Sequence, residues 1–390
     1  MQRPHSQHLS RRDVLKGLAA APLVAAAGSQ APAADAAPSA GLNTLQKLPD
    51  NLEFKFSGLN SVITPTEHFY VRNHFDPPTI DVKSWKLKVE GHVERPFEIG
   101  LDELRSLQSK TQVSLLECAG NGRVFLKAPQ LGLRWELGGV SNGEWTGVPL
   151  SALLEKAGVK RGAVDVILEG ADKGAVNPPF PTTPGTIPFA RSLPLAKAMA
   201  PEVMIAHTMN GQPLTGAHGF PARAIVAGWY GMASVKWLTR IIVSDRPFNG
   251  YFQTFQYTTW ERHGDQASLK PVGEIAVKSQ IARPAGFEVV PVGKAYRVFG
   301  AAWAGSRDVA KVEFSSDRGK SWSAATIQSG KGGAYSWVLW ETSWTPSSTG
   351  THILMSRATD SAGDSQPLER NADLRDAMIT HTLPVEVEVR

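Results

Sequence analysis

Hydrophobic and polar residues alternate along several short segments in the first two thirds of the chain. Trp85, Leu87 and Val89 are separated by charged residues, and this period of two residues is typical of a half-buried β-strand. The segment from Pro149 to Gly158 predicts a helix that ends at Gly158, where glycine readily adopts a left-handed backbone. Further apolar runs predict strands at 164–168, 203–207, 224–226 and 235–243.

Asn210-Gly211 follows one of these strands and predicts a tight hairpin turn. Short strands and short helices are mixed without a regular strand-helix-strand alternation, which favours an α+β fold rather than an α/β fold. We therefore expect one α+β domain at residues 43–271.

The pattern changes at about residue 275, after which strands and turns are the only predicted elements. Apolar runs predict strands at 296–301, 309–314, 335–340 and 352–358, and turns separate them at 317–320 and 360–363. Strands of this length and spacing predict a small β-sandwich at residues 275–390. Four tryptophans are expected to pack in its core or cover it: Trp303, Trp322, Trp337 and Trp340.

The N-terminus has the features of a signal peptide of the twin-arginine type, which we place at residues 1–37. Arg11-Arg12 precedes a mildly apolar run at 17–28, and small residues follow it. The run is shorter than the ~20 residues that span a bilayer, so we expect a periplasmic mature chain without a membrane span. This export route carries folded proteins, often with a cofactor already inserted, and therefore favours a cofactor enzyme.

Charge and cysteine content exclude several classes of function. The formal charge of the 390 residues is +5, and residues 1–37 contribute +2 through four Lys or Arg and two Asp, which leaves +3. So weak a charge argues against nucleic-acid binding and suits small anionic substrates. One cysteine permits neither an intrachain disulfide nor a Cys-x-x-Cys-His haem site. If the protein transfers electrons, a partner protein must therefore accept them.

The single cysteine, Cys118, lies in a glycine-rich segment that follows the apolar run at 113–116. Glycines let the backbone approach a ligand closely, and a neighbouring guanidinium such as that of Arg123 favours the thiolate. A blue-copper site is unfavourable because no histidine occurs between Cys118 and His207. An inert buried thiol, a nucleophile paired with His218 and a metal ligand all remain open from the residues alone.

The segment from Cys118 to Arg123 resembles the Cys-Ala-Gly-Asn-x-Arg motif of the sulfite oxidase family of molybdenum enzymes. Residues 72–74 are similar to the Arg-Asn-His of that family. The resemblance extends in order over nearly the whole mature chain. It implies a molybdopterin-binding domain of the sulfite oxidase type followed by an immunoglobulin-like dimerisation domain. It also implies one molybdenum per chain, bound by the Cys118 thiolate beside one molybdopterin.

The resemblance assigns a role to each further matching position. Substrate-pocket and catalytic roles would belong to Arg72, Arg123, Trp135, Tyr257 and Arg375, and cofactor-binding roles to Tyr70, Asn73, His74, Asp172, His218, Arg223, Ser234 and Lys236. The assignment of Arg375 departs from the pattern, because Ala372-Asp373 stands where animal relatives often have Trp-Asn. Each residue also has an ordinary structural alternative. An arginine could form a surface salt bridge, a histidine could be a structural residue with its hydrogen bonds made within the protein, and an aromatic residue could serve packing alone.

Three functions of different classes remain open at this point. The first is oxidation of sulfite to sulfate, with a separate c-type cytochrome as electron acceptor, a homodimeric enzyme and no haem in this chain. The second is another reaction of the same family, on a sulfur compound, a sulfoxide or nitrate. The third is an exported binding module in which Cys118 is merely buried. Molybdenum content separates the third from the other two.

Overall fold

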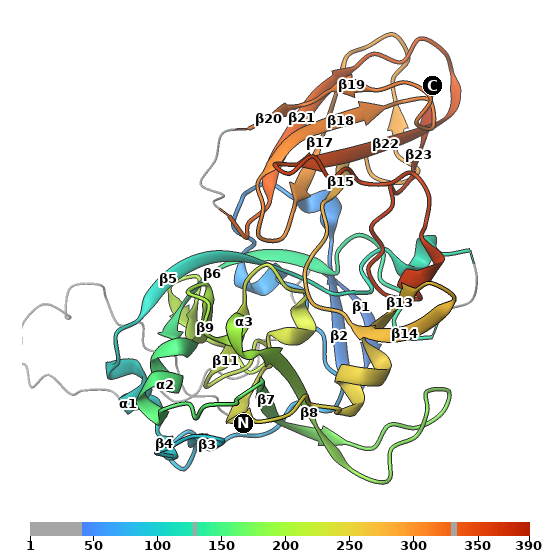
Figure 1. Ribbon diagram of the computed structural model, residues 1–390. Helices are drawn as coiled ribbons and strands as arrows, with labels where there is room; N and C mark the ends of the chain where they lie inside the picture. Colours follow the sequence, from blue (N-terminus) through green and yellow to red (C-terminus); the bar gives the residue numbers. More distant parts are fainter. Residues whose placement is uncertain (1–40, 128–130, 329–333) are drawn as a thin grey trace, which may run out of the picture. The chain divides into compact units, whose positions relative to one another are not determined.

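The computed structural model describes residues 41–127, 131–328 and 334–390 (Figure 1). The signal peptide expected at 1–37 lies outside these residues. No helix within the described residues is long and apolar enough to cross a membrane. Strands dominate and the helices are short, as the α+β prediction requires.

Two five-stranded sheets build the first part of the chain. One has the order β10-β9-β6-β5, with β11 also paired to β9, and the other has the order β4-β3-β12-β7-β8. Their strands are β3 (Leu87–Gly91), β4 (Phe97–Ile99), β5 (Lys110–Glu117), β6 (Val140–Pro149), β7 (Asp165–Gly174), β8 (Ile187–Pro194), β9 (Val203–Met209), β10 (Gln212–Pro213), β11 (Arg223–Val226) and β12 (Leu238–Ser244). The strands β3 and β12 are parallel, so a crossover connects them.

Short helices join these strands. The α-helices are α1 (Leu101–Ser106), α2 (Leu150–Ala157) and α3 (Leu195–Ala198), the 3-10 helices are η1 (Phe56–Gly58), η2 (Thr66–His68), η3 (Arg123–Phe125), η4 (Gly231–Ala233) and η6 (Ala372–Leu374), and a π-helix, η5, spans Phe252–Gln256. Helix α2 ends as predicted, because Gly158 has a φ of 69° and its N–H caps the last turn.

The tight turn at Asn210-Gly211 is also confirmed, since both residues have positive φ and join β9 to β10. One strand starts later than its apolar pattern predicts. The run at 235–243 forms a strand only from Leu238, because Trp237 has a φ of 48° and breaks the extended backbone.

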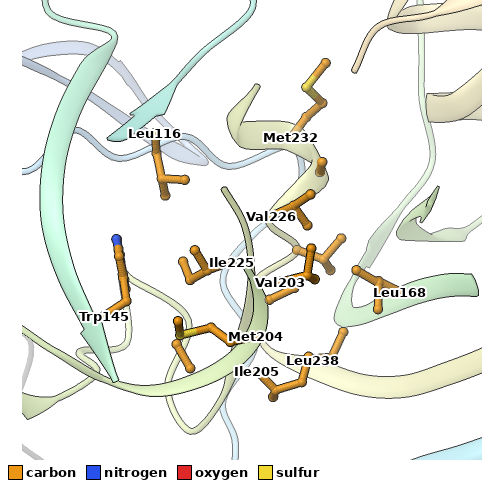
Figure 2. Packing of buried hydrophobic residues seen from close by; sticks show 14 of the residues in the cluster. Leu116, Trp145, Leu168, Val203, Met204, Ile205, Ile225, Val226, Met232 and Leu238 are labelled. Carbon is orange, nitrogen blue, oxygen red and sulfur yellow. The ribbon is translucent and has the colours of Figure 1, made fainter. Parts of the chain in front are cut away.

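The core of this part joins the two sheets. Val203, Met204 and Ile205 of β9 are fully buried and belong to one hydrophobic cluster with Leu168 of β7 and Leu238 of β12, as Figure 2 shows. Near-continuous apolar runs such as that of β9 are expected where a strand is covered on both faces. The sheets therefore form a rigid base for the loops that leave their ends.

The second part of the described chain is a β-sandwich. Its sheets have the orders β15-β17-β21-β20 and β16-β23-β22-β18-β19. The strands are β15 (Lys278–Arg283), β16 (Val289–Val290), β17 (Tyr296–Trp303), β18 (Val309–Ser315), β19 (Ser323–Ala324), β20 (Thr326–Ile327), β21 (Val338–Trp344), β22 (Gly350–Asp360) and β23 (Val385–Val389) (Figure 1). Two separate hairpins are β1 (Leu42–Lys47) with β2 (Asp50–Phe54), and β13 (Thr258–His263) with β14 (Gln266–Pro271).

The four tryptophans divide between two cores, which the sequence did not predict. Trp340 is fully buried in the cluster of the sandwich itself. Trp303 and Trp337 belong instead to the large cluster of the first part. Trp322 is half-buried on the sandwich surface, with the Arg357 guanidinium 4.3 Å from its ring centre. The two cores thus meet at an apolar interface that tryptophans of the second part complete.

The strand predicted at 335–340 begins only at Val338. Tyr335 has a φ of 74°, and its carbonyl accepts a hydrogen bond of 2.8 Å from the N–H of Leu115 in β5. This contact diverts the chain toward the first part before the strand starts.

Candidate active site

Cys118 lies on the turn that directly follows β5. Its N–H donates to the carbonyl of Gly139 and its own carbonyl accepts from the N–H of Asn121, each at 2.8 Å. A Cβ atom on Gly120 would come within 2.4 Å of the Arg123 guanidinium, so a larger residue there would displace that side chain. The thiol is 7% exposed. Burial raises its pKa, while the charge of Arg123 opposes that effect.

Cys118 lines a cavity that is partly open to solvent. The cavity unites segments that are far apart in the sequence: the stretch after η2, the end of β5, β7, the loop before β11, the loop before β12 and the end of η5. Residues that the sequence proposes for the site and that line it are Tyr70, Arg72, His74, Cys118, Asp172, His218, Arg223, Ser234, Lys236 and Tyr257. The folded chain therefore gathers most of the proposed site around one hollow.

The basic side of this cavity is formed by Arg223, Lys236 and His218. The Arg223 guanidinium donates to the carbonyls of Ser234 at 2.9 Å and His218 at 3.2 Å, and the Lys236 ammonium donates to that of Ala217 at 2.9 Å. Burial lowers the pKa of Arg223 to about 10 and that of His218 to about 3, and it lowers the pKa of Lys236 strongly. The hydrogen-bond acceptors of the Arg223 guanidinium are carbonyls, which leave its positive charge in place, so an anion that enters the cavity would be stabilised.

Asp172, on β7, is the acidic residue among those that line the cavity. It is 4% exposed, and its Oδ1 atom has no hydrogen-bond partner. Burial raises its pKa to about 7, although the charge of Lys236 opposes this shift. A buried polar oxygen without a partner is costly, so this atom is suited to a polar group that the cavity receives.

His74 and Tyr257 form a hydrogen-bonded pair at the cavity wall. The distance between His74 Nε2 and Tyr257 Oη is 2.6 Å. The imidazole stacks on Phe189 with the ring centres 4.4 Å apart, and the edge of Phe252 packs against it. Burial and the charge of Arg72 lower the pKa of His74 well below its usual value, and burial raises that of Tyr257. Both side chains are therefore neutral near pH 7, and one proton is shared along their hydrogen bond.

Three residues proposed for the substrate pocket lie outside this cavity lining. The Arg123 guanidinium donates from Nε and Nη2 to the carbonyl of Asp376, at 3.1 and 3.0 Å. Arg375 donates to the carbonyl of Phe255 at 3.3 Å and lines a different hollow. Trp135 is fully buried with its edge toward the Tyr70 ring, 5.8 Å between centres, and its Nε1 atom has no partner. Of the three arginines proposed for the substrate pocket, Arg72 is the one that lines the cavity.

Asn73, the remaining proposed residue, supports the cavity from behind. It is 2% exposed, and its Oδ1 atom accepts a hydrogen bond from the Lys236 ammonium. Its Nδ2 atom donates to the carbonyl of Asp50 at 2.8 Å. Asn73 thereby fixes the position of a cation in the cavity and does not itself face the hollow.

Comparison with known proteins agrees with this arrangement. Residues 74–252 match the model of the oxidoreductase molybdopterin binding domain, and residues 270–389 match that of the Mo-co oxidoreductase dimerisation domain. The sulfite oxidase of Gallus gallus is 34% identical over 324 residues, which are 78% of this chain and 68% of that protein.

The chain belongs to the sulfite oxidase family.

Other members of the family differ in activity. A nitrate reductase of Ulva prolifera is 32% identical over 78% of this chain and 38% of its own length. The crystal structure of the sulfane dehydrogenase SoxCD from Paracoccus pantotrophus superposes with a TM-score of 0.76 at 28% identity, over 88% of this chain and 85% of that one. The chain spans about half the length of several further sulfite oxidases that it matches.

The residues present fit the molybdopterin cofactor of this family. The thiol of Cys118 supplies a soft ligand at the cavity wall. The basic side chains of Arg223 and Lys236 suit the cofactor phosphate, and Oδ1 of Asp172, which has no hydrogen-bond partner among the described residues, suits the polar edge of a pterin ring. The cavity therefore brings together a thiol that could bind a metal, a basic wall that could bind an anion and a free polar atom.

Sequence reasoning missed three buried charges near this site. Arg191 of β8 is fully buried, and its guanidinium lies 5.8 Å from the ring centre of Tyr257. Glu117 and Lys278 form an ion pair in which each side chain is 1% exposed. The signal was available, because each charge interrupts an otherwise apolar run of residues. The sequence does not show the hydrogen-bonding or oppositely charged group that stabilises each of these charges in the interior.

Proposed function

We propose that the protein is an exported, molybdopterin-dependent sulfite dehydrogenase that oxidises sulfite to sulfate and passes the electrons to a separate c-type cytochrome. One observation carries the proposal: the buried Cys118 thiol, the Arg72 guanidinium and the Tyr257–His74 pair line the same cavity, together with the buried basic side chains of Arg223 and Lys236. Such a cavity binds an anionic cofactor and leaves positive charge for a small oxyanion.

The chain's own residues would divide the work between holding the cofactor and handling the substrate. Cys118 would bind molybdenum, while His218, Arg223 and Lys236 would hold the cofactor phosphate and pterin. The bound cofactor supplies the two-electron redox chemistry and the oxygen transfer.

Substrate handling falls to the other wall of the cavity. Arg72 presents a planar cation suited to an oxyanion. Tyr257 can donate its phenolic hydrogen to substrate when His74 Nε2 carries the hydrogen of their mutual bond, and it donates to His74 otherwise. The neutral imidazole can therefore take up or return a proton at Nε2 as the charge of the site changes. Phe189 and Phe252 pack on the His74 ring and hold its orientation.

A second candidate function is oxidation of another sulfur compound, favoured by the likeness to the sulfane dehydrogenase SoxCD. Two sequence features support sulfite instead. Enzymes of the thiosulfate-oxidising systems tend toward Cys-Ser-Gly-Asn, whereas this chain has Cys-Ala-Gly-Asn at 118–121. The combination of Arg72 with Tyr257 also favours sulfite. Sulfoxide reduction is disfavoured because those family members lack the C-terminal sandwich, and nitrate is a further substrate to be tested.

Assembly and location complete the proposal. The dimerisation domain matched at 270–389 supports a homodimer with one molybdenum per chain. The Arg11-Arg12 segment supports export of the folded, cofactor-loaded chain to the periplasm by the twin-arginine route. The single cysteine cannot form a c-type haem site, which supports a separate cytochrome as acceptor.

The test uses protein made in a host that synthesises molybdopterin. We expect one molybdenum per chain and rapid reduction of an artificial acceptor with sulfite, compared with thiosulfate and, in the reverse direction, nitrate. Loss of a residue that orients a metal ligand costs about 10–100-fold, so Cys118→Ser should lower turnover by more than about 100-fold. Thr111→Ser, at an exposed position of the same strand, should leave turnover unchanged. Sulfite oxidation at the wild-type rate by Cys118→Ser would overturn the proposal.

A further inference from the structure

Glu117 is the residue directly before Cys118, and its carboxylate is held by three side chains in the protein interior. Its Oε1 atom accepts from the Lys278 ammonium at 2.9 Å and from Asn121 Nδ2 at 3.1 Å. Its Oε2 atom accepts from Trp303 Nε1 at 2.9 Å. Both oxygens of this buried carboxylate are thus occupied, which is the arrangement that makes a buried charge tolerable.

Two of these donors come from the sandwich. Lys278 is the first residue of β15 and Trp303 is the last of β17, and they lie opposite each other in the register of the two strands. Trp303 is 1% exposed, as is Lys278. One end of a sheet in the second domain therefore presents a cation and an N–H group to a single carboxylate of the first domain.

The hydrogen bonds continue from Glu117 around the Cys118 turn. Asn121 donates to Glu117 and accepts at Oδ1 from the N–H of Gly139 at 3.1 Å, and the carbonyl of Gly139 accepts from the N–H of Cys118 at 2.8 Å. The Lys278 ammonium also donates to the carbonyl of Asn121 at 3.0 Å. Lys278 thus contacts the residues on both sides of the turn that carries the thiol.

We propose that Lys278 and Trp303 are positioning residues for the metal-ligating turn, so that the second domain sets the place of the Cys118 thiol through Glu117. The proposal rests on the role of Cys118 as metal ligand. Without the Lys278 charge, Glu117 would be an uncompensated anion in the interior, and the turn would have to open to hydrate it. The catalytic domain alone therefore does not contain all the groups that hold its metal ligand in place.

The lone cysteine gives a direct test in cofactor-free full-length protein. Cys118 is the only cysteine of the 390 residues, so the rate at which iodoacetamide adds to the protein, followed by mass, reports opening of this one turn. In Lys278→Met we expect the rate to rise by about tenfold or more, because the buried carboxylate loses its counterion. Arg357→Met is the matched control, since it breaks an ion pair of 2.8 Å to Glu313 inside the sandwich, and it should leave the rate unchanged.

Two further variants keep the proposal testable if Lys278→Met fails to fold. Trp303→Phe removes one N–H donor and keeps an aromatic ring, and it should raise the alkylation rate by about two- to fivefold. The double variant Glu117→Gln/Lys278→Met removes both charges and should return toward the wild-type rate. Alkylation at the wild-type rate in a folded Lys278→Met protein, or in Trp303→Phe, would overturn the proposal.

The outcome is separable from that of the proposed function. Sulfite turnover and molybdenum content test the reaction, whereas alkylation of cofactor-free protein tests only the turn. A protein that binds molybdenum and oxidises another substrate would leave the positioning of Cys118 by Lys278 intact. Conversely, unchanged alkylation in a sulfite-oxidising enzyme would reject the positioning and keep the function.

Discussion

Buried charges occur in two regions of this protein, and the two regions treat them differently. In the cavity, Arg223 and Lys236 are buried beside neutral carbonyls, and Oδ1 of Asp172 has no partner. At the contact with the second domain, Glu117 and Lys278 neutralise each other and every carboxylate oxygen is bonded. Since leaving a buried polar group unpaired is costly, the first arrangement anticipates a ligand and the second is complete within the chain.

The largest expected difference between the regions is in the stability of cofactor-free protein. Lys278→Met should lower the free energy of unfolding by about 3–5 kcal/mol, because it leaves Glu117 as an uncompensated buried charge. Lys236→Met should lower it by less, about 1–3 kcal/mol, because Asn73 and Ala217 lose a hydrogen-bond donor while Asp172, whose pKa burial raises to about 7, can take up a proton. Denaturant titration of the two variants measures both values. Equal losses of stability would show that the distinction between the regions is false.

Cofactor removal sharpens the same comparison. A ligand that binds the folded state stabilises it by an amount that grows with its affinity, about 2.7 kcal/mol at 100 times the Kd. Wild-type protein should therefore unfold at a lower temperature after the cofactor is removed. In Lys236→Met this decrease should be smaller, because the variant holds the cofactor less tightly. Calorimetry of cofactor-loaded and cofactor-free samples measures this decrease in unfolding temperature. A decrease in Lys236→Met as large as that of the wild type would show that this lysine does not bind the cofactor.

The two arginines of the motifs provide the next contrast. Arg72→Gln should raise the KM for sulfite by about 10–100-fold with a smaller change in kcat, since a charge-assisted hydrogen bond contributes about 1.5–3 kcal/mol. The Arg123 guanidinium donates hydrogen bonds to the carbonyls of Asp376 and Leu133. Arg123→Gln should therefore lower thermal stability more than it raises KM. Steady-state kinetics with a melting curve on each variant gives the comparison, and an unchanged KM in Arg72→Gln would exclude Arg72 from substrate binding.

The smallest expected effect is in the pH dependence of stability. Burial raises the pKa of both Asp172 and Glu53 to about 7, with Glu136 adding to the shift of Glu53. A raised pKa contributes stability below the unfolded value near 4, and that contribution is lost as the pH rises through about 7. The stability of Asp172→Asn relative to wild type should thus increase between pH 4 and 7, by about 1 kcal/mol or more.

Glu53→Gln is the control for this pH effect, because Glu53 accepts from the N–H of Gly138 at 2.9 Å and does not line the cavity. Cofactor loading should change the pH profile of Asp172→Asn and leave that of Glu53→Gln as it is. Urea unfolding at a series of pH values, with and without cofactor, measures both. Identical responses to loading would argue that Asp172 does not contact the cofactor.

Local patterns in the sequence were sufficient for features that depend on neighbouring residues. The alternation at Trp85, Leu87 and Val89 became three buried side chains, of which Leu87 and Val89 lie in β3 and Trp85 lies just before it. The glycine at 158 ended a helix, and the Cys118 turn followed an apolar strand as predicted. In each case the information lies within about ten residues, the range over which propensity and periodicity act.

Features that depend on distant contacts could not be predicted in this way. The pattern at 335–340 indicates a strand, but a hydrogen bond from Leu115 in another domain turns Tyr335 away. Trp303 and Trp337 match a sandwich core by spacing, yet they pack in the cluster of the first domain. Family motifs identified Arg72 and Arg123 alike, but only the fold shows that Arg72 lines the cavity and that Arg123 lies outside its lining.

The position of Lys278 at the start of β15 determines where the protein can be truncated. A truncation after Pro271 would match the end of β14 and the change in sequence texture. Such a fragment would contain Glu117 without its cation and would expose the apolar surface that Trp303 and Trp337 cover. The boundary visible in the sequence is therefore not a boundary of cooperative folding. Expression trials, domain swaps and fusions should keep residues 41–390 together.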